Sequence, residues 1–471
     1  MLNSRRCSSS RAQGVDMPYA RENAGKGGHS DFVRNPDVVA FLGECDYMRP
    51  PSDEEALRLG QSFLPAPCGE VLLPRHVIAS DASKSDTPIN ERLPSTQVGF
   101  LKISHVLINM TKYAGLVDPQ NRFVDPFKVS EIHRDAHPLT FTMPGSNVRY
   151  KGASSVKNGF RAALFDQLSR VTSDGGRRSV AQVLLDLEDG ATIELDKCPA
   201  CGDSTRKYYF NGGTLVHECS QCRSSIYVTD FLRLHEGISD FGDNSAAMTR
   251  MMNALEHLMI AAFVLEVERG DVARLADLTF VLDGPLAIFG EPAKLSQRLQ
   301  RLIYRINAEL SHRGLRNMLV LGLQKTGGLM DHAKMIERHL PAGTFRVVDD
   351  GYRNEYVTGG DLPAANFGNE TYYGQDFLFK TEKGRIFNFA IPYPFADKSS
   401  PGVSQSFAQA KVELVRYGHL VQQACDLIRH FEMDLYDSAI VPVALAHRHA
   451  SISLMPGGKV LDLMVRSALK P

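Results

Sequence analysis

The chain has 471 residues, of which 43% are hydrophobic and 23% charged, a composition that excludes a disordered or fibrous protein for most of its length. This length allows two or three domains, or one large core that carries an insertion. Lysine and arginine number 53 and aspartate and glutamate 54, so the formal net charge is -1, and any nucleic-acid binding must come from a local basic patch.

The N-terminal region is polar, and residues 1–35 are expected to form a disordered tail. Its arginine- and serine-rich opening could also suggest an organelle transit peptide, but it lacks the apolar stretch of a secretory signal. No apolar run in the chain approaches the roughly 20 residues that cross a bilayer. We therefore expect a cytoplasmic protein with reduced cysteines and no membrane contact.

Strands and helices follow this tail. In the first half of the chain, the residue patterns predict helices at 52–63, 152–172 and 178–188, and strands at 76–83 and 98–110. The strand at 76–83 is expected to end on an acidic turn. A long helix is predicted at 244–268, and because it is apolar on nearly every face, it should be buried.

The second half of the chain alternates regularly between the two kinds of element. Strands are predicted at 279–286, 317–326 and 344–350, helices at 294–313, 330–340 and 405–430, and a hairpin at 375–394 that turns at 382–384. Helices that alternate with apolar strands indicate an α/β fold around one central sheet, and the hairpin makes that sheet mixed.

Four of the eight cysteines form two Cys-x-x-Cys pairs. Cys198 and Cys201 form the first, Cys219 and Cys222 the second, and 17 residues separate the pairs. Two tight turns that each present two thiolates can complete a tetrahedral shell around a structural Zn²⁺. The intervening segment is strand-like with a Gly-Gly turn, as in a zinc ribbon, and its residues 206–210 suit either DNA contact or an ordinary solvated strand. A redox or free-thiol pair is the alternative.

Two aspartates follow apolar strands. Asp81 lies in the segment SDAS, and Asp283 lies in VLDGP, where Gly284 permits a sharp turn. Carboxylates at adjacent strand ends can converge on a hard divalent cation such as Mg²⁺ or Mn²⁺. A strand-end aspartate before glycine is also a common turn signal, so each aspartate alone is weak evidence.

The buried helix offers a third carboxylate. Glu256 is flanked at helical spacing by Met252, Met259 and Ile260, where an unpaired charge would be costly and a metal ion would remove that cost. Glu266 lies near Arg269 at the end of the helix, where solvent is its natural partner. We therefore favour Glu256 over Glu266 as a ligand.

Two further residues follow apolar runs. His447 lies in VPVALAHRHA and could ligate a metal ion or transfer a proton, although a histidine in this position, taken alone, is more often a capping or surface residue. Lys325 ends the predicted strand NMLVLGLQK, where it could neutralise a phosphate or simply end the strand.

Taken in order, these motifs resemble the NurA nucleases, which are partners of the HerA hexameric translocase. The similar segments are ASDAS around Asp81, the Glu256 helix, VLDGPLA around Asp283, the strand that ends in Lys325, and ALAH around His447. The resemblance covers residues 70–471 apart from the cysteine segment. Two features depart from the family: the zinc ribbon resembles an insertion, and SAIVPVALAH replaces a Gly-Tyr-Pro element, which leaves the family's tyrosine without a match.

The resemblance implies an RNase H-like core formed by residues 36–190 and 236–471, interrupted by a zinc-ribbon insertion at 191–235. It also implies a Mn²⁺-dependent (or Mg²⁺-dependent) DNA nuclease that works as a homodimer with a HerA-like ATPase, in DNA end processing or phage defence. Asp81, Glu256, Asp283 and His447 take the family's metal-site positions, and Lys325 joins them as a candidate catalytic residue.

Two other functions remain open at this point. A non-catalytic zinc-ribbon protein that binds DNA or a motor would need only the cysteine site. A metal-dependent phosphatase for small substrates would be expected to carry a phosphate-binding loop, and the sequence contains none that is recognisable. Cleavage of DNA with Mn²⁺, compared with cleavage in EDTA, separates the nuclease from the adaptor.

Overall fold

The computed structural model describes residues 30–45, 50–90, 92–116, 136–170, 178–358, 367–400, 402–403, 406–432 and 440–452. The chain divides into two compact units, Met1–Arg49 and Pro50–Pro471. In the first, helices α1 (Ser30–Val33) and α2 (Pro36–Glu44) are described, and the Asn35 side chain caps α2 by accepting a hydrogen bond from the Asp37 backbone. Most of the tail expected to be disordered, residues 1–29, lies outside the described residues.

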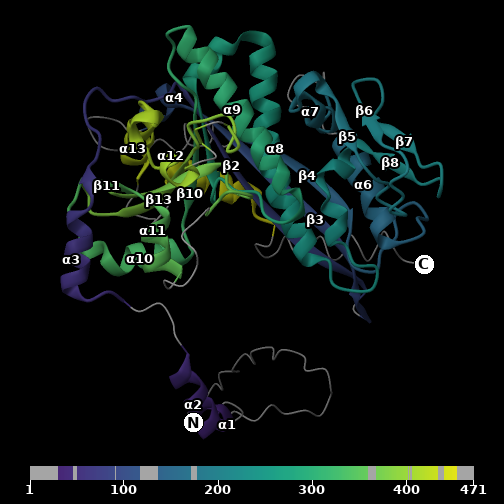
Figure 1. The fold of residues 1–471 in the computed structure, drawn as a ribbon, viewed down its shortest axis with the longest axis horizontal. Helices are drawn as coiled ribbons and strands as arrows, with labels where there is room; N and C mark the ends of the chain where they lie inside the picture. Colours follow the sequence, from purple (N-terminus) through teal and green to yellow (C-terminus); the bar gives the residue numbers. More distant parts are fainter. Residues whose placement is uncertain are drawn as a thin grey trace, which may run out of the picture. The chain divides into compact units, whose positions relative to one another are not determined.

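One nine-stranded mixed sheet organises the second unit, in the order β1-β11-β12-β13-β10-β9-β2-β3-β4 (Figure 1). Strands β2, β9 and β10 run parallel to one another, and the other neighbours are antiparallel. The strands are β1 (Leu64–Pro65), β2 (His76–Asn90), β3 (Leu93–Asn109), β4 (Ala136–Pro144), β9 (Leu278–Asp283), β10 (Leu319–Gln324), β11 (Thr344–Val347), β12 (Gly374–Lys380) and β13 (Ile386–Pro392). The mixed α/β architecture expected from the sequence is confirmed.

Helices cover both faces of the sheet. The larger hydrophobic core lies between one face and α6 (Val156–Arg170), α7 (Val180–Asp186), α8 (Ser245–Asp271) and α9 (Leu295–His312). A second core lies on the other face beneath α13 (Leu420–Phe431) and α14 (Val441–Ala450). The other α-helices among the described residues are α3 (Asp53–Gln61), α4 (Met110–Ala114), α10 (Gly328–Ile336), α11 (Asp350–Arg353) and α12 (Phe407–Ala410). No described helix has the length and apolar character to span a bilayer.

Helix α8 is the long buried helix that the sequence predicted, and it crosses the sheet in front of β2 and β3 (Figure 1). Its midsection, from Ala254 to Ala262, is buried at every position. A helix that is apolar on all sides is stable only when other elements surround it, and here the sheet, α7 and α9 do so. Polar side chains on this helix are therefore exceptions that call for partners.

Two predicted elements differ from the structure. Strand β2 does not end on an acidic turn at residue 83 but continues to Asn90, because its backbone pairs with β3 along this whole length. The predicted helix at 405–430 is three shorter pieces, α12, the 3-10 turn Leu414–Tyr417, and α13. Gly418, with a positive φ of 54°, reverses the backbone before α13 and so prevents one continuous helix.

The cysteine segment forms two small antiparallel pairs, β5 (Ile193–Leu195) with β6 (Tyr208–Phe210), and β7 (Val216–Glu218) with β8 (Ser225–Tyr227). It lies beside α6 and α7 (Figure 1). Buried Cys198, Phe210 and Ile226 belong to the same hydrophobic core as α6 and α8. The segment therefore packs as part of the second unit, rather than as a module on a flexible tether.

Candidate metal centre

Parallel pairing of β2 and β9 brings Asp81 and Asp283 together. Ser80 pairs with Leu282, so the two aspartates are the next residues along the neighbouring strands. Side chains alternate between the faces of a strand, and Ala79 and Val281 belong to the core beneath α13 and α14. Asp81 and Asp283 therefore point to that face, at the place where β9 ends and β2 continues.

Helix α14 adds a histidine to this pair. The Nδ1 atom of His447 lies 2.8 Å from Asp81 Oδ2, and the backbone N–H of Ala82 donates to Asp81 Oδ1 at 2.8 Å. Asp81, Asp283 and His447 each present one ligand atom, and these atoms lie within 4.8 Å of one another. Asp81 is only 7% exposed, whereas the His447 side chain is 67% exposed, so the cluster opens to solvent on the histidine side.

Lys325 lies at the end of the third parallel strand. Leu323 of β10 is in register with Asp283, which places Lys325 just beyond the end of β9. Its Nζ donates to Asp283 Oδ2 at 2.6 Å. The predicted strand-end lysine is thus in contact with the predicted strand-end aspartate.

Glu256 approaches from the opposite face of the sheet. It projects from α8, is 7% exposed, and its Oε1 accepts no hydrogen bond among the described residues. Burial, followed by the charges of Asp81 and Asp283, raises the pKa of Glu256 well above its usual value. Glu256 is therefore close enough for the charges of both aspartates to affect its pKa. It does not belong to the group whose ligand atoms lie within 4.8 Å of one another.

The alternative glutamate has no such surroundings. Glu266 Oε2 accepts a hydrogen bond at 3.2 Å from Arg269, and both side chains are partly exposed to solvent. Its charge is satisfied locally, as the sequence suggested. The structure thus brings Asp81, Asp283, His447 and Lys325 together with Glu256 nearby, and leaves Glu266 elsewhere.

The electrostatics of the cluster suit a cation. Burial and the neighbouring charge of Asp283 raise the pKa of Asp81, and this effect exceeds the opposing effect of the His447 hydrogen bond. The ammonium group of Lys325 offsets the charge of Asp283, but the adjacent carboxylate of Asp81 and the unpartnered Glu256 oxygen remain costly without a further positive charge. A hard divalent cation, which prefers carboxylate oxygens, would remove this cost with Asp81 and Asp283 as ligands and His447 or Glu256 beside them.

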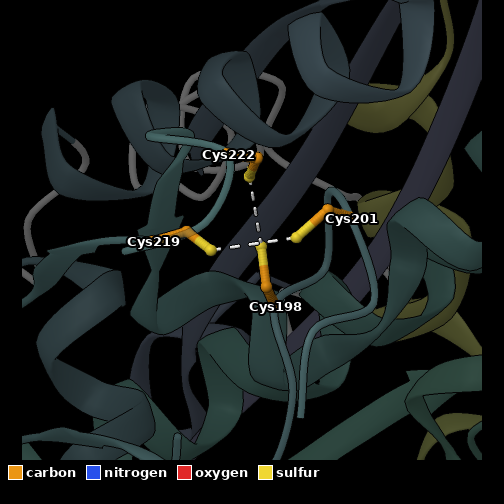
Figure 2. Close-up of side chains that lie close together, drawn as sticks. All are labelled: Cys198, Cys201, Cys219 and Cys222. Carbon is orange, nitrogen blue, oxygen red and sulfur yellow. Dashed lines mark hydrogen bonds between the residues drawn. The ribbon is translucent and has the colours of Figure 1, made fainter. Parts of the chain in front are cut away.

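The four cysteines form a second cluster that could hold a metal ion (Figure 2). The Sγ atoms of Cys198 and Cys222 are 3.8 Å apart, and those of Cys201 and Cys219 are also 3.8 Å apart. A tetrahedral zinc ion with Zn–S bonds of about 2.3 Å places its sulfur atoms roughly 3.8 Å from one another. The donor set and its spacing therefore fit Zn²⁺.

The thiol pKa values show why a metal ion would matter here. A hydrogen bond from the Cys222 backbone is the main factor that lowers the pKa of Cys219 to about 6, while burial raises the pKa of Cys198 to about 12. Without a cation, four crowded thiolates repel, so the protons stay on part of the set. A bound metal ion favours the thiolate form of all four.

Polar residues on α8 were missed by the sequence reasoning. His257 is 2% exposed, and burial lowers its pKa to about 3, so its imidazole is neutral. Its Nδ1 shares a 2.6 Å hydrogen bond with the hydroxyl of buried Tyr373. The available signal was a histidine beside Glu256 in the otherwise apolar stretch from Ala254 to Val264. Tyr436, the tyrosine nearest to the family's position, lies outside the described residues.

No protein-family model matches the chain, and no curated protein matches it. Among solved structures, the NurA nuclease from Sulfolobus solfataricus is similar at 9% sequence identity, with 93% of each chain covered and a TM-score of 0.34. This likeness is too low to carry an argument about activity. The fold and the two clusters define the chain as a mixed α/β protein with two sites that could hold metal ions.

Proposed function

We propose that the chain is a divalent-metal-dependent DNA nuclease that hydrolyses phosphodiester bonds. The observation that carries this proposal is the convergence of Asp81, Asp283 and His447 within 4.8 Å, where β9 ends beside the parallel strand β2 and α14 approaches them. The adjacent block β4-β3-β2-β9-β10 has three antiparallel strands followed by parallel ones, an order that supports an RNase H-like core.

A bound Mn²⁺ or Mg²⁺ would activate a water molecule and offset the charge that develops on the phosphate. The residues of the chain would hold the ion, orient its ligands and neutralise phosphate charge. Asp81 and Asp283 supply the negative charge that holds the ion, and His447 fixes the orientation of the Asp81 carboxylate through its 2.8 Å hydrogen bond. Lys325 keeps an ammonium group within one hydrogen bond of Asp283, where it can also neutralise phosphate charge.

DNA is favoured over a small phosphate ester by the shape of the sheet. Strand β2 runs nine residues past Asp81 to Asn90, so the paired strands β2 and β3 extend well beyond the cluster as one mostly half-buried ribbon. A polymer is long enough to contact the edge of these strands beyond the cluster, whereas a small ester is not. The phosphate-binding loop that a small-substrate enzyme would be expected to carry is also missing from the sequence.

The four-cysteine cluster is proposed to hold a structural Zn²⁺ in a ribbon that docks DNA or a partner. Three residues in and beside strand β6 are already engaged within the protein and so are not free to contact DNA. Tyr208 and Phe210 are buried, and Lys207 forms ion pairs with Glu194 and Asp196. Tyr209, which is 52% exposed, is left as the aromatic side chain that can stack on a base.

The proposal also includes an assembly with a second copy of the chain and with a partner ATPase. Because the net charge is -1, the chain offers no general attraction to DNA, and processive work on a long duplex needs a partner that grips and moves it. We infer a homodimer that binds a HerA-like hexameric ATPase in the cytoplasm and acts in DNA end processing or phage defence. Chromatography of the two proteins together, followed by cleavage with and without ATP, tests this assembly.

The decisive experiment is degradation of end-labelled DNA in Mn²⁺, compared with EDTA, by the parent and three variants. Asp283→Asn and Glu256→Gln should lose cleavage, while Glu266→Gln, which removes an equivalent charge from the same helix, should keep it. Full activity in Asp283→Asn would end the nuclease proposal. Metal-independent DNA binding without cleavage in the parent would favour the adaptor instead.

A further inference from the structure

The loop that follows Asp283, residues 284–291, folds back over the sheet toward α8. Gly284 has a φ of 139°, which lets the chain reverse directly after the strand, and its backbone N–H donates to Leu323 O at 2.9 Å. A Cβ atom on Gly322 would lie 2.6 Å from Gly284 O, so the reversed loop packs directly on β10. The position of Asp283 is thus tied to the path of this loop.

Helix α8 holds the loop through polar side chains that share one face. Asn253 makes two hydrogen bonds to the loop backbone: its Nδ2 donates to Ala287 O at 3.2 Å, and its Oδ1 accepts from Phe289 N at 3.3 Å. One turn earlier, Arg250 Nη1 donates to Glu291 Oε1 at 2.5 Å.

The third contact comes from one turn later on the helix. His257 binds the hydroxyl of Tyr373 at 2.6 Å, and the backbone N–H of Tyr373 donates to Leu286 O at 2.8 Å. Ile288 N also donates to Thr371 O at 2.9 Å. The loop is therefore held between α8 on one side and the segment before β12 on the other, and His257 joins the two.

Close packing limits movement at the end of the loop. Gly290 has a φ of 77°, and a Cβ atom there would lie 2.8 Å from both Cδ and Nε of Arg250. A glycine is needed at this position both for the backbone conformation and for the approach of the guanidinium group. The contact between the loop and α8 is thus specific rather than incidental.

Residues 250, 253 and 257 follow the i, i+3, i+7 spacing of one helix face, and Glu256 lies between the last two. We propose that Arg250, Asn253 and His257 form a clamp that fixes the Glu256 helix to the Asp283 loop, and that this clamp sets the metal affinity of the centre. The three are positioning residues. This inference rests on the proposed metal centre, because a clamp between two ligand-bearing elements matters only if both serve one ion.

The physical basis is the precision that metal ligands require. Polar partners that orient metal ligands from outside the coordination shell typically contribute 10- to 100-fold to metal affinity. In this centre the ligands reside on a helix and on a strand from opposite faces of the sheet, and their separation is set by how the two elements are joined. If the clamp is loosened, the carboxylates can still bind, but the chain must first bring them together, which weakens binding.

The test compares Asn253→Ala with a matched control. Asn307 on α9 makes the same pair of backbone hydrogen bonds, donating to Met318 O at 3.1 Å and accepting from Met318 N at 2.8 Å, but at the opposite end of β10. Mn²⁺ binding is measured by calorimetry, together with thermal melting in EDTA. Both variants should melt lower by similar amounts, but only Asn253→Ala should bind Mn²⁺ 10- to 100-fold more weakly.

A second pair of variants distinguishes a specific loss of Mn²⁺ affinity from a loss caused by unfolding. His257→Gln keeps a side chain that can bond Tyr373 and should retain most of the affinity, whereas His257→Phe should lose it. Parent-like Mn²⁺ affinity in a folded Asn253→Ala would overturn the clamp, and so would an equal loss of affinity in Asn307→Ala. The proposed metal centre fails separately, if the parent binds no Mn²⁺ or if Asp283→Asn binds Mn²⁺ as the parent does.

Discussion

Asp81→Asn should raise the stability of the metal-free protein while removing the proposed Mn²⁺-dependent cleavage of DNA. The ligand atoms of Asp81 and Asp283 lie within 4.8 Å. At an effective dielectric constant of about 20, two negative charges at that distance repel by roughly 3.5 kcal/mol. The substitution keeps the shape of the side chain but removes this repulsion.

One favourable interaction is lost at the same time. The ion pair of Asp81 with His447, whose side chain is 67% exposed, is worth at most about 1 kcal/mol. The ammonium group of Lys325, 2.6 Å from Asp283, also offsets part of the repulsion. The balance is therefore a gain of at most about 2 kcal/mol in the free energy of unfolding without metal, which for a chain of this length corresponds to a rise in Tm of roughly 2 °C.

Mn²⁺ should reverse the order of stability. At a concentration about 100-fold above its dissociation constant, a ligand that binds only the folded state stabilises it by about 2.7 kcal/mol. The parent should gain this and the variant should not. Cleavage of DNA by the variant should fall by roughly a thousandfold or more, since losing a metal ligand costs several kcal/mol of transition-state stabilisation.

The assay is thermal melting of both proteins at pH 8, in EDTA and in Mn²⁺, beside the cleavage assay. Asp277→Asn is the control, because Asp277 lies at the other end of β9 in an exposed 3.5 Å pair with Arg75. It should change either Tm by less than about 1 °C. A variant that melts below the parent in EDTA, or a parent that Mn²⁺ does not stabilise, would refute this reasoning.

Three other predictions follow from the structure. Glu256→Gln should lose Mn²⁺-dependent cleavage and Glu266→Gln should not; because the pKa of Glu256 is raised, Mn²⁺ binding to the parent should also tighten as pH rises, which calorimetry at several pH values checks. Purified protein should carry about one zinc per chain by elemental analysis, and Cys198→Ser should lower the main melting transition more than Cys222→Ser, since Cys198 is 1% exposed in the shared core and Cys222 is exposed. Burial lowers the pKa of His332 to about 4. Between about pH 6.5 and pH 4, His332 therefore binds a proton in the unfolded chain but not in the folded chain. The free energy of unfolding should fall by about 3 kcal/mol over this range. Denaturant melts across this range should show a flatter profile for His332→Gln, and an unchanged profile would contradict the assignment.

Local patterns predicted most of the second half of the fold. Strand β9, the hairpin of β12 and β13, and the buried helix α8 each carry a periodicity that short-range geometry dictates. The part of strand β2 past Ser83 was missed because its sequence, KSDTPIN, is polar. Pairing with β3, which satisfies its backbone, keeps it extended.

The sequence by itself determined the kinds of candidate metal ligand and the elements that carry them. The Cys-x-x-Cys spacing fixes a four-sulfur donor set within one short segment, and Asp81, Glu256 and Asp283 each stand out from an apolar element. These signals are local, because each depends on residues within a few positions of one another.

Only the tertiary structure decided which of these residues meet. His447 reaches Asp81 across 366 residues of chain, and Lys325 reaches Asp283 because β10 pairs with β9 in one particular register. Arg250, Asn253 and His257 find their hydrogen-bond partners only when the loop after Asp283 folds back onto their helix. Contacts of this kind depend on the packing of whole elements, which no short stretch of sequence encodes.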